Sequence, residues 1–215
     1  MSQKPDWLVA HGKPWRRGPP RPIYDNPWIS LTEYDAVAPT GADALYGVVG
    51  FKNFALAILP IHDDGTITLV GQNRLPCDDY SWEIPEGGGP LAEDPVESAK
   101  RELLEETGLA AAHWQEILRM QLSNSVTDEQ AFGYLAMGLS QVHAEPQGDG
   151  TEDILRARVP FREALDAAVG GYMRDALTVA MLLRGYHMAR EGALPRELSA
   201  AMLGLRGTSW DGRNR

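Results

Sequence analysis

The sequence predicts an α/β protein of the α+β type, in which a mixed β-sheet is sandwiched between helices. Apolar runs of strand length, separated by turns, fill most of residues 28–86. The hydrophobic period then changes to that of a helix over residues 94–107. Two further strand-like runs follow, and a second helical stretch covers residues 161–191 with a break at Gly170–Gly171.

The composition narrows the classes of function. The chain has 215 residues, 43% of them hydrophobic, and no apolar run of membrane-spanning length. A formal net charge of -10 argues against a nucleic-acid binder and favours a small-molecule ligand. The N-terminus shows no secretory signal, and Cys77 is the single cysteine, so we expect a cytoplasmic protein without disulfides and without a membrane partner.

The chain divides into four expected segments. Residues 1–22, rich in Pro, Gly and Arg, are expected to form an extended arm with no packed fold of its own. An N-terminal β segment is expected over 23–47, the main domain over 48–192, and a short helix with a tail over 193–215. Strands are expected at 28–38, 45–51, 54–62, 67–74, 81–86, 113–123 and 130–142.

The helix predicted over 94–107 has clear boundaries. Asp94 is a suitable N-cap, Pro95 a suitable first residue, and Glu97 completes a capping box. Gly108 is placed to end the helix. Before it, three consecutive glycines at 87–89 are expected to break the preceding strand into a loop. The apolar stripe of the helix consists of Val96, Ala99 and Leu103.

Three glutamates share one face of this helix. Glu102, Glu105 and Glu106 are spaced i, i+3 and i+4, where like charges repel. They also lie in the last turns, where the helix dipole disfavours anions. A solvated acidic face would explain them, and so would a site for divalent cations, because Mg²⁺ prefers carboxylate oxygens and retains open positions for phosphates.

The surrounding pattern favours the cation site. Residues 87–109 read G-x5-E-x7-R-E-U-x-E-E-x-G-U, where U is a bulky aliphatic residue, and every position of this pattern is filled. The pattern is the Nudix box, and the chain resembles Nudix hydrolases over roughly residues 22–190. These enzymes hydrolyse a nucleoside diphosphate linked to another group.

The resemblance implies roles for the residues of the box. Glu102, Glu105 and Glu106 are implied as ligands of two or more Mg²⁺ or Mn²⁺ ions, together with the backbone carbonyl of Glu86. Arg101 is implied to orient the glutamates, so Arg101 and Glu105 also count as catalytic candidates. Glu93 is implied to support the loop.

Residues outside the box resemble the ADP-ribose and nucleotide-sugar pyrophosphatase branch. "GQNR" followed by "WEIPEGG" implies that Arg74 contacts the substrate phosphates and that Glu83 lines the site. A surface arginine at a strand end is the alternative for Arg74. The N-terminal segment of this branch is often exchanged in a homodimer, and Trp28 and Tyr46 are the candidates for stacking on the nucleobase, unless they are core or interface residues.

The general base is expected in the segment "SNSVTDE", residues 123–129, which departs from the branch's usual loop because it lacks Pro-Gly. Glu129 is the first candidate for the base, and Glu152 is the second, or a further metal ligand. The expected reaction is Mg²⁺-dependent hydrolysis of ADP-ribose or a related nucleoside-diphosphate sugar to a nucleoside monophosphate and a sugar phosphate. The alternatives are a (deoxy)nucleoside triphosphate pyrophosphohydrolase and a non-catalytic ligand sensor.

Overall fold

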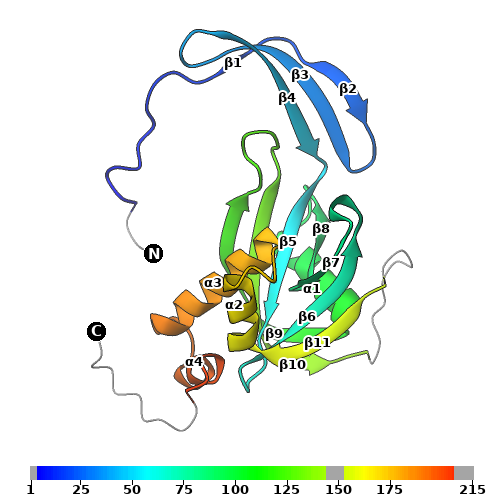
Figure 1. Ribbon diagram of the computed structural model, residues 1–215, viewed down its shortest axis with the longest axis vertical. Helices are drawn as coiled ribbons and strands as arrows, with labels where there is room; N and C mark the ends of the chain where they lie inside the picture. The colour runs from blue at the N-terminus through cyan, green and yellow to red at the C-terminus, as the bar shows by residue number, and fades with distance from the viewer. Residues whose placement is uncertain (1–3, 144–152, 206–215) are drawn as a thin grey trace. The chain divides into compact units, whose positions relative to one another are not determined.

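The computed structural model describes residues 4–143 and 153–205, which form two compact units (Figure 1). The N-terminal unit contains the chain up to Lys52 together with Leu122–Glu129. The second unit, which we call the main unit, contains the remaining described residues. None of the described helices combines the length and the apolar character needed to cross a membrane.

The N-terminal unit is a four-stranded antiparallel sheet centred on β3 (Ile29–Val37). Strands β1 (Arg16–Arg17) and β2 (Arg21–Asp25) pair with one edge of β3, and β4 (Asp43–Phe51) pairs with the other. The expected extended arm therefore joins this sheet from Arg16 onward. The boundary expected between residues 47 and 48 lies inside β4.

A distant segment completes the N-terminal unit. The Val49 amide donates to the carbonyl of Val126 at 2.9 Å, and Val49 forms a parallel bridge with Thr127. The Asp128 carboxylate accepts the Phe51 amide at 2.9 Å. Among the described residues of this unit, Ala36 is the one that is fully buried, so the sheet has almost no core of its own.

The main unit contains a mixed sheet, as the sequence predicts. Strands β5 (Asn53–Pro60) and β10 (Gln130–Gln141) pair in parallel at its centre, and the two outer pairings are antiparallel. The outer strands are β8 (Glu86–Pro90) and β9 (Leu109–Gln121). A second sheet consists of β11 (Leu155–Pro160), β6 (Thr66–Arg74) and β7 (Asp79–Glu83), with the short 3-10 helix η1 (Leu75–Cys77) between β6 and β7. The sequence reading did not predict β11, whose alternating arginines pair with one edge of β6.

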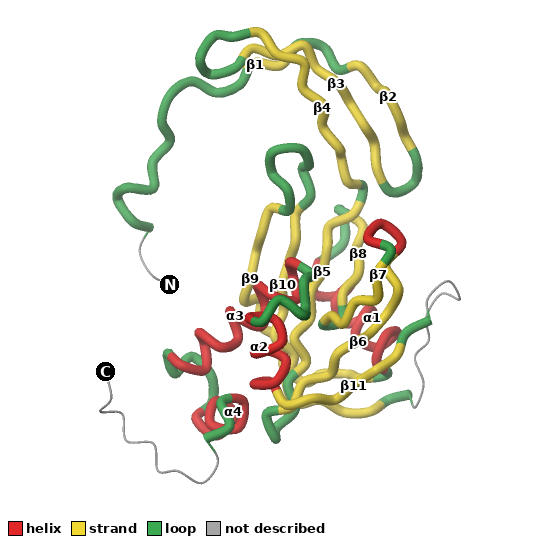
Figure 2. Tube along the Cα trace, in the orientation of Figure 1, coloured by secondary structure: helices red, strands yellow, loops and turns green. Residues whose placement is uncertain are grey.

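Helices pack on both faces of the mixed sheet (Figure 2). Leu56 and Ile58 of β5 share a buried cluster with Ala99 and Leu103 of α1 (Pro95–Thr107). Leu59, which points to the opposite face, lies close to α3 (Ala176–Arg190): a Cβ atom at Gly185 would come within 2.9 Å of its side chain. The remaining helices are α2 (Phe161–Val169) and α4 (Arg196–Met202), and the latter is the short C-terminal helix expected from the sequence.

Helix α1 follows its sequence signals closely. The Asp94 carboxylate accepts the Val96 amide at 3.2 Å, and Gly108 ends the helix with a φ of 70°. Glu97 differs from the expectation, because its carboxylate pairs with Lys100 at 2.6 Å and does not close a capping box.

The expected glycine loop is wrong, because Gly87–Gly89 form most of strand β8. Gly87 lies opposite Leu56 and Gly89 opposite Phe54 in the ladder with β5. A Cβ atom at Gly87 would come closer than 3.0 Å to the Glu102 carboxylate, and one at Gly89 would come closer than 3.0 Å to the Phe54 ring and the Ser98 hydroxyl. Gly87 and Gly89 therefore lack side chains where atoms of α1 and of Phe54 lie directly against this strand.

We predict that Gly89→Ala destabilises the protein, whereas Gly88→Ala is tolerated. The added methyl group at position 89 meets the Phe54 ring and Ser98 of α1, and overpacking of this kind costs about 1–3 kcal/mol. At position 88 the nearest atom is the Phe54 carbonyl oxygen, at an ordinary 3.6 Å. Urea unfolding of both variants measures the difference, and equal stabilities would contradict this account of the glycines.

Candidate active site

Arg101 connects the carboxylates of α1 to strand β8. Its guanidinium lies 2.9 Å from Glu102 Oε1 and 2.8 Å from Glu105 Oε2, and it donates to the Gly88 carbonyl at 3.1 Å. The resemblance implies an orienting role for Arg101, and that role requires ion pairs of this kind. The three contacts fix the side chains of two candidate metal ligands relative to the glycine strand.

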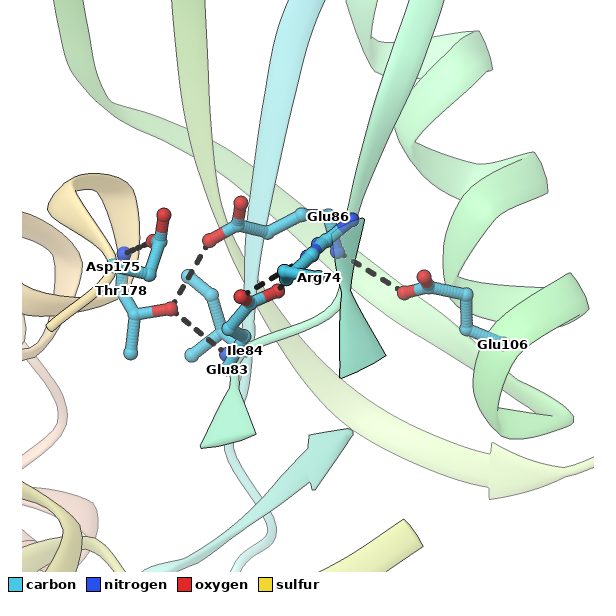
Figure 3. Close-up of polar contacts among 7 residues, drawn as sticks. All are labelled: Arg74, Glu83, Ile84, Glu86, Glu106, Asp175 and Thr178. Atoms are coloured by element: carbon cyan, nitrogen blue, oxygen red, sulfur yellow. Dashed lines mark hydrogen bonds and ion pairs between the residues drawn. The ribbon is translucent and has the colours of Figure 1, made fainter. Parts of the chain in front are cut away.

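Glu106, on the same face of α1, also reaches strand β8. Its side chain is 3% exposed and accepts the backbone amide of Glu86 at 3.0 Å (Figure 3). The peptide unit on the N-terminal side of Glu86 is therefore held by α1. Glu93 supports the connection before the helix, because it accepts a hydrogen bond from the buried Ser98 hydroxyl.

Arg74 and Glu83 form a closely hydrogen-bonded ion pair between adjacent strands. Arg74 Nε donates to both Glu83 oxygens, at 3.1 and 3.2 Å, and its terminal nitrogen also contacts Glu83. Glu83 is 3% exposed, whereas the Arg74 side chain retains 38% exposure. Its hydrogen bonds to Glu83, with the nearby charges of Glu86 and Glu106, raise the pKa of Arg74. Arg74 is therefore a cation of fixed orientation that still has accessible donors.

The Glu86 side chain is held by the beginning of α3. The Thr178 hydroxyl donates to Glu86 Oε1 at 3.0 Å and accepts the Ile84 amide at 3.1 Å (Figure 3). Burial, followed by repulsion from Asp175, raises the pKa of Glu86 well above its usual range. The sequence reading missed Thr178 and Asp175, although Asp175-x-x-Thr178 is an N-cap pattern and Asp175 does accept the Thr178 amide at 2.7 Å.

The donors in this region have the chemistry that Mg²⁺ or Mn²⁺ requires. Glu102, Glu105 and Glu106 offer carboxylate oxygens on one helix, and the charges of Glu83 and Glu86 lie nearby. No three acidic, histidine or cysteine side chains converge in metal-binding geometry within residues 4–143 and 153–205. Arg101 instead pairs with two of the three helix carboxylates, those of Glu102 and Glu105.

The remaining candidates belong to the N-terminal unit or lie outside the described residues. The Trp28 side chain is 65% exposed. Tyr46 donates its hydroxyl to the Ser125 carbonyl, and its ring packs edge-on against Trp15 with centroids 5.2 Å apart. Burial raises the pKa of Glu129, and repulsion from the nearby charge of Asp128 raises it further. Glu152 lies outside the described residues.

The glutamate helix, the glycine strand and the Arg74–Glu83 pair all lie in one unit of the structure. The chain belongs to the NUDIX domain family, which it matches over residues 52–178. The match covers the box and ends at Thr178. It also leaves out almost all of the contiguous part of the N-terminal unit.

Within this family, the relatives point to the ADP-ribose pyrophosphatase branch. An ADP-ribose pyrophosphatase of Mycobacterium tuberculosis is 31% identical over 145 residues, covering 67% of this chain and 70% of the relative. Another, from Bacillus subtilis, is 31% identical over 156 residues, covering 73% and 84% respectively. A crystal structure of an ADP compounds hydrolase matches 86% of this chain and 100% of its own with a TM-score of 0.75; at 19% identity it supports the fold alone.

We predict that Glu86→Gln stabilises the metal-free protein at high pH and not at low pH. Because the folded-state pKa of Glu86 is raised, its contribution to stability is present below the unfolded pKa of about 4.3 and is lost as pH rises towards the folded value. Glutamine keeps an oxygen for the Thr178 hydroxyl and removes the charge. Thermal unfolding in EDTA from pH 4 to pH 8 measures the effect, and a difference from the parent that does not change with pH would contradict it.

Proposed function

We propose that this protein is a Mg²⁺-dependent hydrolase of the diphosphate in ADP-ribose or a related nucleoside-diphosphate sugar. The products are a nucleoside monophosphate and a sugar phosphate. Membership of the Nudix family and two relatives named as ADP-ribose pyrophosphatases support the reaction class. The observation that carries the proposal is the orientation of Arg74. Glu83 fixes its guanidinium near the carboxylates of Glu86 and Glu106.

Residues of α1 and β8 hold the divalent ions in this proposal. Glu102, Glu105 and Glu106 provide carboxylate oxygens, and Glu86 provides its backbone carbonyl, for two or more ions of Mg²⁺ or Mn²⁺. When bound, such ions neutralise phosphate oxygens and lower the pKa of a coordinated water. Arg101 orients Glu102 and Glu105, the carboxylates that would hold these ions.

Other side chains bind the substrate and accept the proton. Arg74 donates hydrogen bonds to the diphosphate, and Glu83 maintains the orientation of the guanidinium. Glu129 serves as the general base that removes a proton from the attacking water. Its raised pKa suits this role, because a base works best when its pKa approaches the operating pH.

The N-terminal unit recognises the nucleoside and forms a homodimer in this proposal. The exposed Trp28 ring offers an aromatic face for the base, whereas Tyr46 already uses its hydroxyl on Ser125. Among the described residues of this four-stranded sheet, Ala36 alone is buried. In the proposed dimer, a second copy of the chain would bury more of the sheet. The setting is the reducing cytoplasm, which suits the exposed free thiol of Cys77.

We predict that the purified protein with Mg²⁺ hydrolyses ADP-ribose faster than a deoxynucleoside triphosphate, and that Glu106→Gln lowers kcat at least a hundredfold. Glu106 is a buried carboxylate on the amide of Glu86, and glutamine keeps its shape without its charge. The control is Glu97→Gln, on the same helix but paired with Lys100 at the surface, which should keep full activity.

A panel containing ADP-ribose, ADP-glucose, GDP-mannose and the triphosphates measures turnover. Without turnover of any diphosphate the proposal fails, and preference for triphosphates favours the pyrophosphohydrolase alternative.

We predict that Trp28→Ala raises KM for ADP-ribose about 5- to 100-fold, because loss of one stacking contact removes about 1–3 kcal/mol of binding. The exposure of the ring indicates that its removal costs little stability. Steady-state kinetics measure KM, and light scattering after size-exclusion chromatography measures the mass of both proteins. An unchanged KM in a dimeric variant would exclude Trp28 from the nucleoside site.

A further inference from the structure

The N-terminal end of α3 contacts both ends of strand β7. Arg174, two residues before the helix, forms an ion pair with Asp79, the first residue of β7. Thr178, in the first turn, accepts the amide of Ile84, the residue that follows β7. Asp175 caps the helix and holds the Thr178 amide at 2.7 Å. One helix end therefore sets the position of the strand that carries Glu83.

Thr178 makes the more constrained of these two contacts. Its side chain is fully buried, and its hydroxyl is used both as an acceptor from Ile84 and as a donor to Glu86 Oε1 at 3.0 Å. Ile84 and Glu86 flank Pro85, whose carbonyl accepts the Ile58 amide at 2.9 Å. The Thr178 hydroxyl therefore contacts the residues on both sides of Pro85, which itself has no amide hydrogen to donate.

Glu83 and Glu86, on either side of Ile84 and Pro85, contact the two halves of the candidate site. Glu83, immediately before Ile84, holds Arg74. The backbone amide of Glu86 donates a hydrogen bond to the Glu106 carboxylate of α1 at 3.0 Å. The orientation of the Ile84–Glu86 segment therefore determines how the arginine is placed relative to the glutamate helix (Figure 3).

We propose that Thr178 is a positioning residue, whose hydroxyl aligns the phosphate-binding Arg74–Glu83 pair with the metal-holding residues of β8 and α1. This inference rests on the proposed function, since it concerns the same site. Thr178 itself touches neither the substrate nor the ions. Its effect passes through Ile84 and Glu86, and it requires a side chain that both donates and accepts. Serine retains these properties, whereas valine has the same shape without them.

The test compares Thr178→Val with Thr178→Ser and with Leu182→Val. Leu182 is fully buried one turn further along α3, so its truncation destabilises the helix packing without altering the hydroxyl. Electron paramagnetic resonance measures Mn²⁺ affinity in the absence of nucleotide, and calorimetry measures the thermal midpoint. Steady-state kinetics with ADP-ribose give kcat and KM. We expect Thr178→Val to weaken Mn²⁺ binding about 10- to 100-fold and to lower kcat, as loss of an outer contact to a metal ligand does. Thr178→Ser should stay within about threefold of the parent.

The outcomes are distinguishable. If Leu182→Val lowers the thermal midpoint as much as Thr178→Val but retains Mn²⁺ affinity, the positioning role is supported. Equal losses of Mn²⁺ affinity in both variants, or parent-like binding in Thr178→Val, would overturn it and leave the proposed function intact. A parent protein that neither binds Mn²⁺ nor hydrolyses a diphosphate overturns the proposed function and this inference with it.

Discussion

The close approach of α1 to the glycine strand is the contact on which the site depends. With no side chains at positions 87 and 89, the helix lies near enough for Arg101 to reach the Gly88 carbonyl and for Glu106 to reach the Glu86 amide. Glycine weakens an isolated strand, because it contributes no packing and loses the most entropy on folding. Here the ladder with β5 and the helix above offset that cost.

The electrostatics of the main unit follow from this packing. Bringing α1 onto β8 places several carboxylates close together, with Arg74 and Arg101 as their cationic partners. The buried Glu86 beside Asp175 adds a cost, which appears as its raised pKa. A fold that keeps such charges together without ions sacrifices stability for an arrangement that is ready for cations, a trade that is common at functional sites.

Much of this arrangement could be predicted from local sequence. The caps and apolar stripe of α1 and the strands β3–β6 follow from patterns spanning a few residues, whereas the pairing of Arg101 with the glutamates was implied only by the family resemblance. The glycine run could not be assigned this way, because the atoms that exclude a side chain belong to Phe54 and to Ser98 and Glu102 of α1. Thr178 was missed for a similar reason. Its N-cap pattern is visible, but its partners Ile84 and Glu86 are more than ninety residues away in the chain.

The N-terminal unit is discontinuous in the sequence, since Val49 pairs with Val126 and Phe51 with Asp128. No single cut separates the two units: cleavage after Lys52 would remove the sheet and leave residues 122–129 without their hydrogen-bonding partner. The same constraint applies to recombination between relatives. A chimaera that inherits its first fifty residues from one parent must also inherit the turn between β9 and β10 from that parent. The two segments are therefore expected to be exchanged together as one heritable module, although some seventy residues lie between them.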